Sequence, residues 1–224
     1  MTKPIGLRPH LSLSETLLLA DVPEATVRKD IADSVLLPIR ETVDKEPLFR
    51  WVDPFFLAAV YRNPALGRRL RRRALDRLEF CVAPPLRKVF LLNTDSPASL
   101  ALFHRPSRMV SGERISLDEY FYLDFEAVRE EVGPRVDLYA RGLSRITENS
   151  AVIEDEAVFR DTRMSVRHIG QMAASGTPVA DIICDYRYLG KKDIAFAVLY
   201  SQAHPLIERH LSIPGKARSG VQPG

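Results

Sequence analysis

The chain has 224 residues, of which 46% are hydrophobic and 27% are charged, and these values are ordinary for a folded protein with a buried core. It contains no apolar run near the roughly 18 residues of a membrane span, no signal-peptide core after its first residues, and only two cysteines. We therefore expect a cytoplasmic protein that does not use a membrane, a disulfide framework, a metal or another cofactor.

The net charge of +3 at pH 7 conceals a partition along the chain. Residues 1–112 carry a net charge of +6, residues 113–161 carry −7, and residues 162–224 carry +4. A basic–acidic–basic order predicts separate segments with separate partners. Helical periodicity dominates with a few strand-like runs, so the expected fold class is mainly α with a small β component (α+β).

Residues 1–48 are predicted to form a helix-turn-helix region that binds DNA. Ser12 lies three residues before Glu15, which is the spacing of a capping box and indicates the start of a helix. Asp21-Val22-Pro23 ends that helix, and a second helix is predicted from about residue 24 to residue 33. In DNA-binding proteins with this arrangement, the second helix lies in the major groove.

The second predicted helix carries Val27 and Ile31 at the spacing of a buried stripe. Thr26, Arg28 and Lys29 are then left on outward or flanking positions. Arginine and lysine donate hydrogen bonds to guanine edges or to phosphates, and threonine can reach either. These three residues are therefore candidate DNA contacts, although any amphipathic helix pair would give a similar pattern.

Residues 49–150 are predicted to form a small central region of helices and strands. Asn63-Pro64 indicates the start of an arginine-rich helix, with proline in its first turn. Arg68, Arg69 and Arg72 on this helix are further candidate DNA contacts, since neutralising phosphates supplies most non-specific affinity. The alternative is a solvated face paired with the acidic middle of the chain.

The rest of this central region is predicted to contain short strands followed by one long helix. Short β-branched or aromatic runs over residues 88–92, 99–103 and 120–125 predict strands. A helix should follow from about residue 125 to residue 146. Gly133-Pro134 predicts an interruption of that helix, because proline cannot donate the backbone hydrogen bond of a helix interior.

Residues 151–205 predict a homeodomain-like module of one β-hairpin and three short helices. Two strand-like runs fold about Asp161-Thr162, and the first helix ends at Gly176. Thr177-Pro178 opens the second helix, and the third runs from Lys191 to about His204.

The third helix of this module is apolar on every side from Ile194 to Tyr200, which indicates that it is buried. Three short helices cannot cover it completely, so we expect its outer face to meet a second copy in a symmetric homodimer. The candidate dimerisation residues are Phe159, Met164, Phe196, Leu199 and Tyr200. DNA reading by this module, through Arg160, Arg163 and Arg167, is the alternative.

The sequence contains no glycine-rich phosphate loop, no nucleophile elbow and no histidine pair with metal-ligand spacing. We therefore expect a protein that is not an enzyme and has no catalytic or metal-binding residue. The alternative is a nucleic-acid-processing enzyme that uses Glu154, Asp155 and Glu156, although a solvated turn explains the same three acids.

The C-terminal module resembles a known family. The stretch from Glu156 to Val166, Glu-Ala-Val-Phe-Arg-Asp-Thr-Arg-Met-Ser-Val, is followed by Gly176 and by Asp185-Tyr186 before the last helix. This pattern is similar to that of prokaryotic antitoxins with a homeodomain-like module, the domain of unknown function 433 family. The sequence departs from the pattern at Asp161, where the family usually has glycine, and at Arg187, where proline is usual.

The layout of the whole chain resembles the longer VapB-type antitoxins of VapBC systems, which add an N-terminal helix-turn-helix to this module. The resemblance implies a PIN-domain ribonuclease toxin as partner, with a Mg²⁺ site built from acidic residues. It also implies that the protein binds operator DNA and represses the shared operon, as a homodimer or in a higher-order complex with the toxin. The alternative is a stand-alone DNA-binding transcriptional regulator.

Residues 206–224 are too rich in glycine and proline to build a core, and they are predicted to be a toxin-binding tail. Its apolar side chains suit an apolar groove, and its basic ones suit a carboxylate site, because arginine matches carboxylates bidentately. The candidate toxin-binding residues are Leu206, Ile207, Arg209, Leu211, Ile213, Lys216 and Arg218. The alternatives are an unstructured terminus without a partner, and a toxin held by the acidic segment 113–161 alone.

Overall fold

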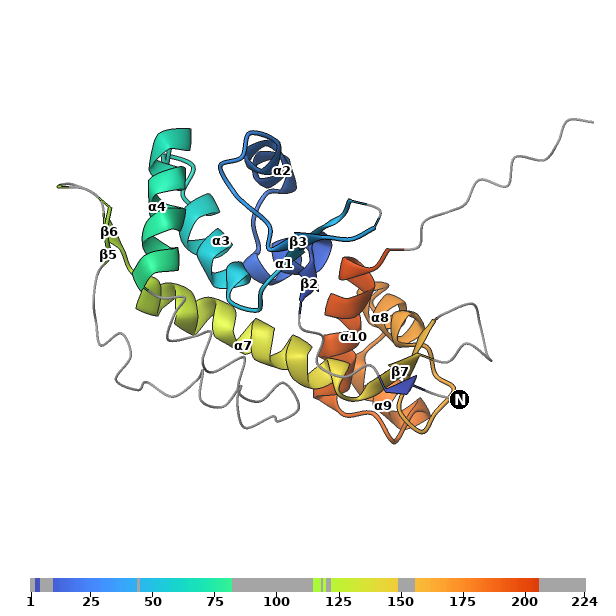
Figure 1. Ribbon diagram of the computed structural model, residues 1–224. Helices are drawn as coiled ribbons and strands as arrows, with labels where there is room; N and C mark the ends of the chain where they lie inside the picture. Colours follow the sequence, from blue (N-terminus) through green and yellow to red (C-terminus); the bar gives the residue numbers. More distant parts are fainter. Residues whose placement is uncertain are drawn as a thin grey trace, which may run out of the picture.

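The N-terminal part of the chain forms two helices at the predicted positions, α1 (Leu13–Ala20) and α2 (Glu24–Ala32) (Figure 1). The capping box of α1 is confirmed, because Ser12 Oγ accepts a 3.2 Å hydrogen bond from Glu15 N and a Glu15 carboxylate oxygen accepts a 2.7 Å bond from Ser12 N. Asp21 ends α1 in the left-handed conformation, with a φ of 55°.

The computed structural model describes residues 3–4, 10–43, 45–81, 115–117, 119, 122–148 and 156–205. The chain is mainly helical with small antiparallel sheets, as the sequence predicts. No helix within these ranges is both long and apolar enough to cross a membrane. The predicted strands over residues 88–92 and 99–103 lie outside the described residues.

The strands are short and antiparallel, and they gather elements that are far apart in the sequence. The first sheet has the order β2 (Leu11–Ser12), β4 (Pro47–Phe49) and β3 (Arg40–Glu41). The second sheet has the order β1 (Lys3–Pro4), β7 (Ile146–Glu148) and β8 (Ala157–Phe159). The third pairs β5 (Ile115–Ser116) with β6 (Tyr122–Leu123).

The central helices are α3 (Asp53–Tyr61), which is buried along its whole length, and α4 (Arg68–Cys81). The predicted start of the arginine-rich helix at Asn63-Pro64 is wrong, because α4 begins at Arg68. Asn63 instead forms a turn between the two helices, in which its side-chain oxygen accepts a 3.0 Å hydrogen bond from Ala65 N.

The long helix α7 (Phe125–Leu143) continues through Pro134, so the predicted interruption is wrong. Pro134 is exposed, and a proline removes one backbone donor from the ladder without unfolding the turns on either side. Those turns are held by packing, since α7 contacts α3 and α1 as well as the C-terminal module. Figure 1 shows α7 as one helix that runs beneath α3 and on toward the C-terminal helices.

The C-terminal module contains the three predicted helices, α8 (Val166–Ala174), α9 (Val179–Asp185) and α10 (Lys191–Ala203). Gly176 follows α8 with a φ of 90°, a conformation that favours glycine. The predicted hairpin is partly different, because the main partner of β8 is β7. A single bridge between Val158 and Ser165 closes the turn about Asp161.

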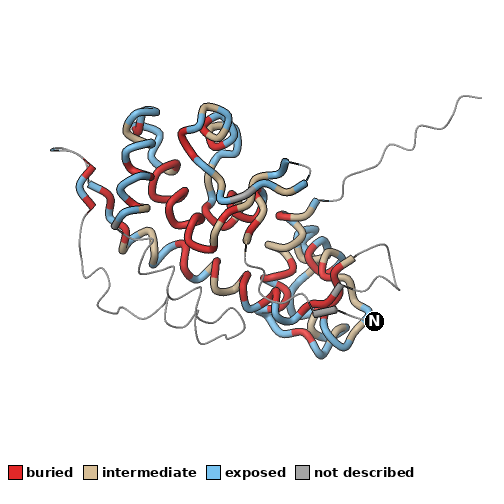
Figure 2. Tube along the Cα trace, viewed as in Figure 1, coloured by how far each residue is buried: buried red, intermediate tan, exposed pale blue. Residues whose placement is uncertain are grey.

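One hydrophobic core runs through the described chain, from Leu11 near the start to Ala197 in α10 (Figure 2). Helix α10 packs on α8, α7 and α1. Two glycines permit the closest approaches. A Cβ at Gly142 in α7 would lie 2.0 Å from the Phe196 ring, and a Cβ at Gly170 in α8 would lie 2.3 Å from the Ala197 carbonyl oxygen.

Candidate nucleic-acid interface

The second helix, α2, turns one face to the core and one face to solvent. Val27 is fully buried, as the sequence predicts, and Thr26 is half-buried. The exposed face combines two cationic with two small side chains, at the i, i+3, i+4, i+7 spacing of one helix face. These residues are Ala25, Arg28, Lys29 and Ala32.

On this face, Arg28 forms an ion pair with Glu24, with 2.5 Å between Arg28 Nε and Glu24 Oε1. Both side chains are more than half exposed, at 58% and 56%, so water screens the pair and it contributes little to stability. An incoming phosphate can replace the carboxylate at small cost. Lys29 is also exposed.

A buried ion pair fixes the orientation of α2. The Asp30 carboxylate is 1% exposed and accepts hydrogen bonds from Arg71 Nε at 2.6 Å, from Arg71 Nη2 at 2.9 Å and from Tyr61 Oη at 3.0 Å. Burial opposes ionisation of Asp30, but the hydrogen bonds from Arg71 and Tyr61 outweigh it and hold the pKa of Asp30 below its ordinary value. The Arg71 guanidinium also lies 5.7 Å from the centre of the Tyr61 ring.

Two of the predicted DNA-binding arginines in α4 contact the end of α2. Arg68 Nη2 donates a 3.2 Å hydrogen bond to the Asp33 carbonyl oxygen, and Arg72 Nη1 donates a 2.6 Å bond to the Ser34 carbonyl oxygen. Cations at the C-terminal end of a helix satisfy its last carbonyls and complement its dipole. Arg68 and Arg72 therefore hold the C-terminal end of α2 against α4.

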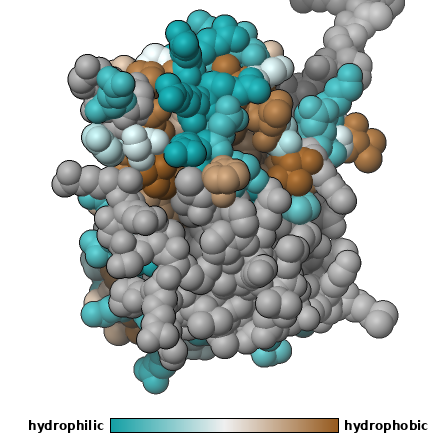
Figure 3. Space-filling view, turned by 60° about the vertical axis from the view of Figure 1, so that its left-hand side comes forward, coloured by the Kyte–Doolittle hydropathy of each residue, from teal (hydrophilic) through white to brown (hydrophobic). Residues whose placement is uncertain are grey.

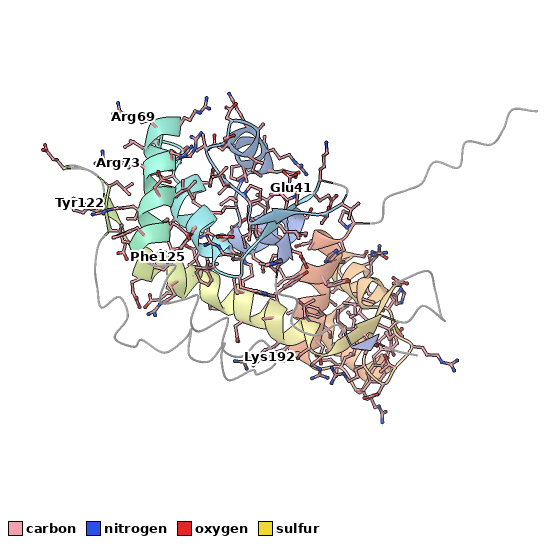
Figure 4. The ribbon with its side chains drawn as sticks, in the orientation of Figure 1. Glu41, Arg69, Arg73, Tyr122, Phe125 and Lys192 are labelled. Carbon is pink, nitrogen blue, oxygen red and sulfur yellow. The ribbon has the colours of Figure 1, made fainter. Side chains whose placement is uncertain are left out.

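The third predicted arginine of α4 lies elsewhere. Arg69 and Arg73 are exposed on the side of α4 that points away from α2 (Figure 4). Figure 3 shows hydrophilic residues gathered at this end of the molecule, over α4 and α2. The structure thus brings Arg28 and Lys29 together on the exposed face of α2, while Thr26 is half-buried outside that face. It does not bring Arg69 to the same face.

The Asp30–Arg71 pair and its Tyr61 partner were not predicted from the sequence. Asp30 lies three residues after Val27, on the face that the helical period buries, but its charge argued against burial because lone carboxylates are rarely found in a core. Because Arg71 points inward to Asp30, the arginines of α4 cannot all contact one partner.

The expected dimer face of α10 is covered within the chain. Phe196 is fully buried, with its ring centre 5.6 Å from that of Tyr139, and Phe159 is 2% exposed. The expectation that these two side chains meet a second copy is wrong. Helices α7 and α1 cover α10, which carries Phe196, and β8, which carries Phe159, packs against β7 and α8. Met164, Leu199 and Tyr200 are half-buried and pack against the same core.

The remaining predicted site residues, from Leu206 to Arg218, lie outside the described residues. Within the described ranges, no group of three or more histidine, cysteine, aspartate or glutamate side chains is arranged to hold a metal ion.

Residues 146–201 match the model of a family described as a protein of unknown function (DUF433). The matched stretch begins with β7 and ends within α10, so it covers the C-terminal module, and the predicted resemblance is confirmed for that module. No curated protein and no solved structure is matched by the chain.

Proposed function

We propose that the protein is the antitoxin of a type II toxin–antitoxin system, in which it binds operator DNA, represses its own operon and neutralises a PIN-domain ribonuclease toxin in the cytoplasm. The observation that carries the DNA-binding half of this proposal is the exposed cationic face of α2. The toxin-binding half rests on the resemblance of the C-terminal module and on the basic, apolar tail that follows α10.

The face of α2 suits a DNA groove in both charge and shape. Arg28 and Lys29 supply donors for phosphates or base edges, and neither is buried. Ala25 and Ala32 flank them with side chains too small to hold the helix backbone away from DNA. A recognition helix inserted into the major groove uses this combination of close approach and long donors.

The support behind α2 gives this face a fixed direction. A helix of nine residues is too short to be stable alone, since isolated helices below about 12–15 residues are marginal in water. Helix α2 is held to α4 by the Asp30–Arg71 ion pair and by the hydrogen bonds of Arg68 and Arg72, and α4 is itself part of the core. Arg28 and Lys29 are therefore presented by a rigid element, so that little ordering entropy is lost on binding.

A homodimer remains part of the proposal, because two-fold symmetric operators are bound by two-fold symmetric proteins. Its contacts must come from surfaces other than Phe159 and Phe196, which are buried in each chain. Repression by this protein does not call for chemistry, so the proposal includes no catalytic residue and no cofactor.

The DNA-binding half is tested with the full chain and a duplex that covers the region upstream of its own gene. Replacing Arg28 and Lys29 by alanine should raise Kd at least tenfold, and it should lower the slope of log K against log salt by about two, because each cation neutralises one phosphate. Lys192→Ala is the matched control, because Lys192 is an exposed lysine of α10 at the other end of the molecule (Figure 4). Equal losses of affinity in the double variant and in Lys192→Ala would contradict the assignment of α2 as the helix that contacts DNA.

The toxin-binding half is tested by co-expression with the neighbouring gene and mass measurement of the purified complex. Deletion of residues 206–224 should abolish toxin binding while operator binding is retained. A chain that binds its operator but captures no product of the neighbouring gene would instead be a stand-alone regulator.

A further inference from the structure

A pocket of about 910 Å³ lies in the C-terminal module, between the end of α7, the turn after β8 and the loop before α10. Its lining includes three arginines, Arg145, Arg160 and Arg163, and a single acidic side chain, Asp161. The pocket is thus positively charged in a chain whose net charge is only +3. A hollow that collects this many guanidinium groups favours an anionic ligand.

The turn that carries two of these arginines is rigid. Phe159 N donates a 3.0 Å hydrogen bond to the Met164 carbonyl oxygen, and Thr162 Oγ1 both donates to the Phe159 carbonyl oxygen at 2.8 Å and accepts from Met164 N at 3.1 Å. Asp161, at the tip, has a left-handed φ of 61°. Arg160 and Arg163 flank Asp161-Thr162 in the sequence, and both are exposed and line the pocket.

Backbone and carboxylate contacts orient two of the guanidinium groups without using all of their donors. Arg160 Nη2 donates a 2.5 Å hydrogen bond to the Ser144 carbonyl oxygen. Arg145 Nε lies 3.1 Å from Asp193 Oδ1, while the other oxygen of Asp193 accepts from Gly190 N at the start of α10. Each guanidinium carries five N–H donors, so most of them remain for a ligand.

An aromatic side chain completes the lining. Tyr188 is 48% exposed, and its phenol interacts with the side chain of Thr162. Burial raises the pKa of Tyr188 above its ordinary value, which is already well above 7, so the hydroxyl is a neutral hydrogen-bond donor at pH 7 with or without the shift. The exposed part of the ring offers a face on which a nucleobase can stack.

We propose that this pocket binds a phosphate ester, with Arg160 and Arg163 on the phosphate and Tyr188 against the attached base. Arginine forks match phosphate oxygens bidentately, and several guanidinium groups suit a phosphate better than a singly charged carboxylate. This site is distinct from the α2 face, because α2 and the elements that form the pocket lie at opposite ends of the molecule (Figure 1). Phosphate binding here does not depend on the antitoxin proposal.

The test uses the full chain with two probes, a fluorescein-labelled single-stranded RNA followed by anisotropy, and adenosine 5′-monophosphate followed by calorimetry. The double substitution Arg160→Ala, Arg163→Ala should weaken binding about tenfold or more, because two charged groups that hold the phosphate are removed. Arg187→Ala is the matched control, since Arg187 is an exposed arginine of the same module that does not line the pocket. It should change binding less than about twofold, because no group in the pocket is removed.

The single substitution Arg163→Glu is a second test, which leaves the hydrogen bond of Arg160 to Ser144 in place. It should also weaken binding, because it puts a negative charge next to the phosphate. Binding of the mononucleotide would identify the source as a free nucleotide, and binding of the strand alone would identify a nucleic-acid backbone; either supports the phosphate chemistry. Absence of binding, equal losses in Arg187→Ala, or equal competition by hexaglutamate would overturn the proposal. Duplex binding through Arg28 and Lys29 is measured separately, so the two proposals fail independently.

Discussion

The hydroxyl of Tyr139, near the C-terminal end of α7, donates a 2.7 Å hydrogen bond to Oε1 of Glu15, in the first turn of α1, and both side chains are fully buried. His204 Nε2, at the end of α10, lies 3.2 Å from the same oxygen. The other carboxylate oxygen accepts from Ser12 N. One buried carboxylate therefore caps α1 and joins it to α7 and α10, three elements that are far apart in the sequence.

Replacing Tyr139 by phenylalanine should destabilise the protein by about 1–3 kcal/mol, because it removes a donor from a buried charged acceptor while leaving the ring in place. The free energy of unfolding in urea, at pH 7, measures this change. Tyr122→Phe is the control, since Tyr122 is 56% exposed and should have almost no effect. Equal urea midpoints for the two variants would show that the Tyr139–Glu15 bond is energetically neutral.

The Asp30–Arg71 pair predicts a stability difference that depends on pH. Asp30→Asn should cost on the order of 3 kcal/mol at pH 7, because it leaves the Arg71 guanidinium without its buried counter-charge. The pKa of Asp30 is lower in the folded protein than the ordinary value of about 3.9, so its contribution is complete above that value and is lost as the pH falls toward the folded pKa.

Urea unfolding of the wild type and of Asp30→Asn at pH 7, 5 and 3 checks this prediction. The difference in their free energies of unfolding should be similar at pH 7 and 5 and smaller at pH 3. Asp76→Asn, at a side chain that is 71% exposed, serves as the control and should leave stability nearly unchanged. A gap between wild type and Asp30→Asn that widens on acidification would contradict the lowered pKa.

Gly170→Ala should destabilise the C-terminal module by about 1–3 kcal/mol or more, because the new methyl group meets backbone, which cannot rotate away. The nearest atom is the Ala197 carbonyl oxygen at 2.3 Å. Gly67→Ala is the matched control, since a Cβ there meets nothing within 4 Å. Thermal unfolding followed by circular dichroism should show a lower Tm for Gly170→Ala alone, and a shared Tm would mean that α8 and α10 can separate at little cost.

Pro134→Ala should stabilise the protein, by as much as about 3 kcal/mol, because alanine restores the backbone donor that proline removes from the interior of α7. Pro64→Ala, at an exposed turn outside any helix, should produce a small change of the opposite sign, since the unfolded chain gains freedom there. Guanidinium denaturation of both variants measures the two effects, and a destabilised Pro134→Ala would mean that the proline is needed for the shape of α7.

The signals that predicted the fold correctly are short-range ones. The capping box of Ser12 and Glu15 acts across three residues, and the glycine stop at Gly176 depends on one backbone conformation. The class of the fold, the positions of α1 and α2 and the three helices of the C-terminal module follow from such signals. They need no knowledge of distant parts of the chain.

The parts that the sequence could not supply depend on distant partners. Arg71 meets Asp30 across 41 positions, so the charge pattern of α4 alone could not separate this inward arginine from Arg69 on the outside. The break expected at Pro134 is a local tendency that tertiary packing overrides. The exposed cationic residues were therefore predicted correctly on α2, where exposure follows from one helix, and only in part on α4.

The contact between Phe196 and Gly142 has a consequence for where this protein can be cut. Residues 146–201 match a family model, but the backbone on which the Phe196 ring rests belongs to α7, outside that range. Excising the matched stretch would expose the Phe196 ring to solvent, together with the face of α10 that α7 and α1 bury. The matched stretch is therefore shorter than the unit that packs together, so we expect the module to keep its fold in another chain only if a helix there offers, as α7 does at Gly142, a glycine beneath the Phe196 ring.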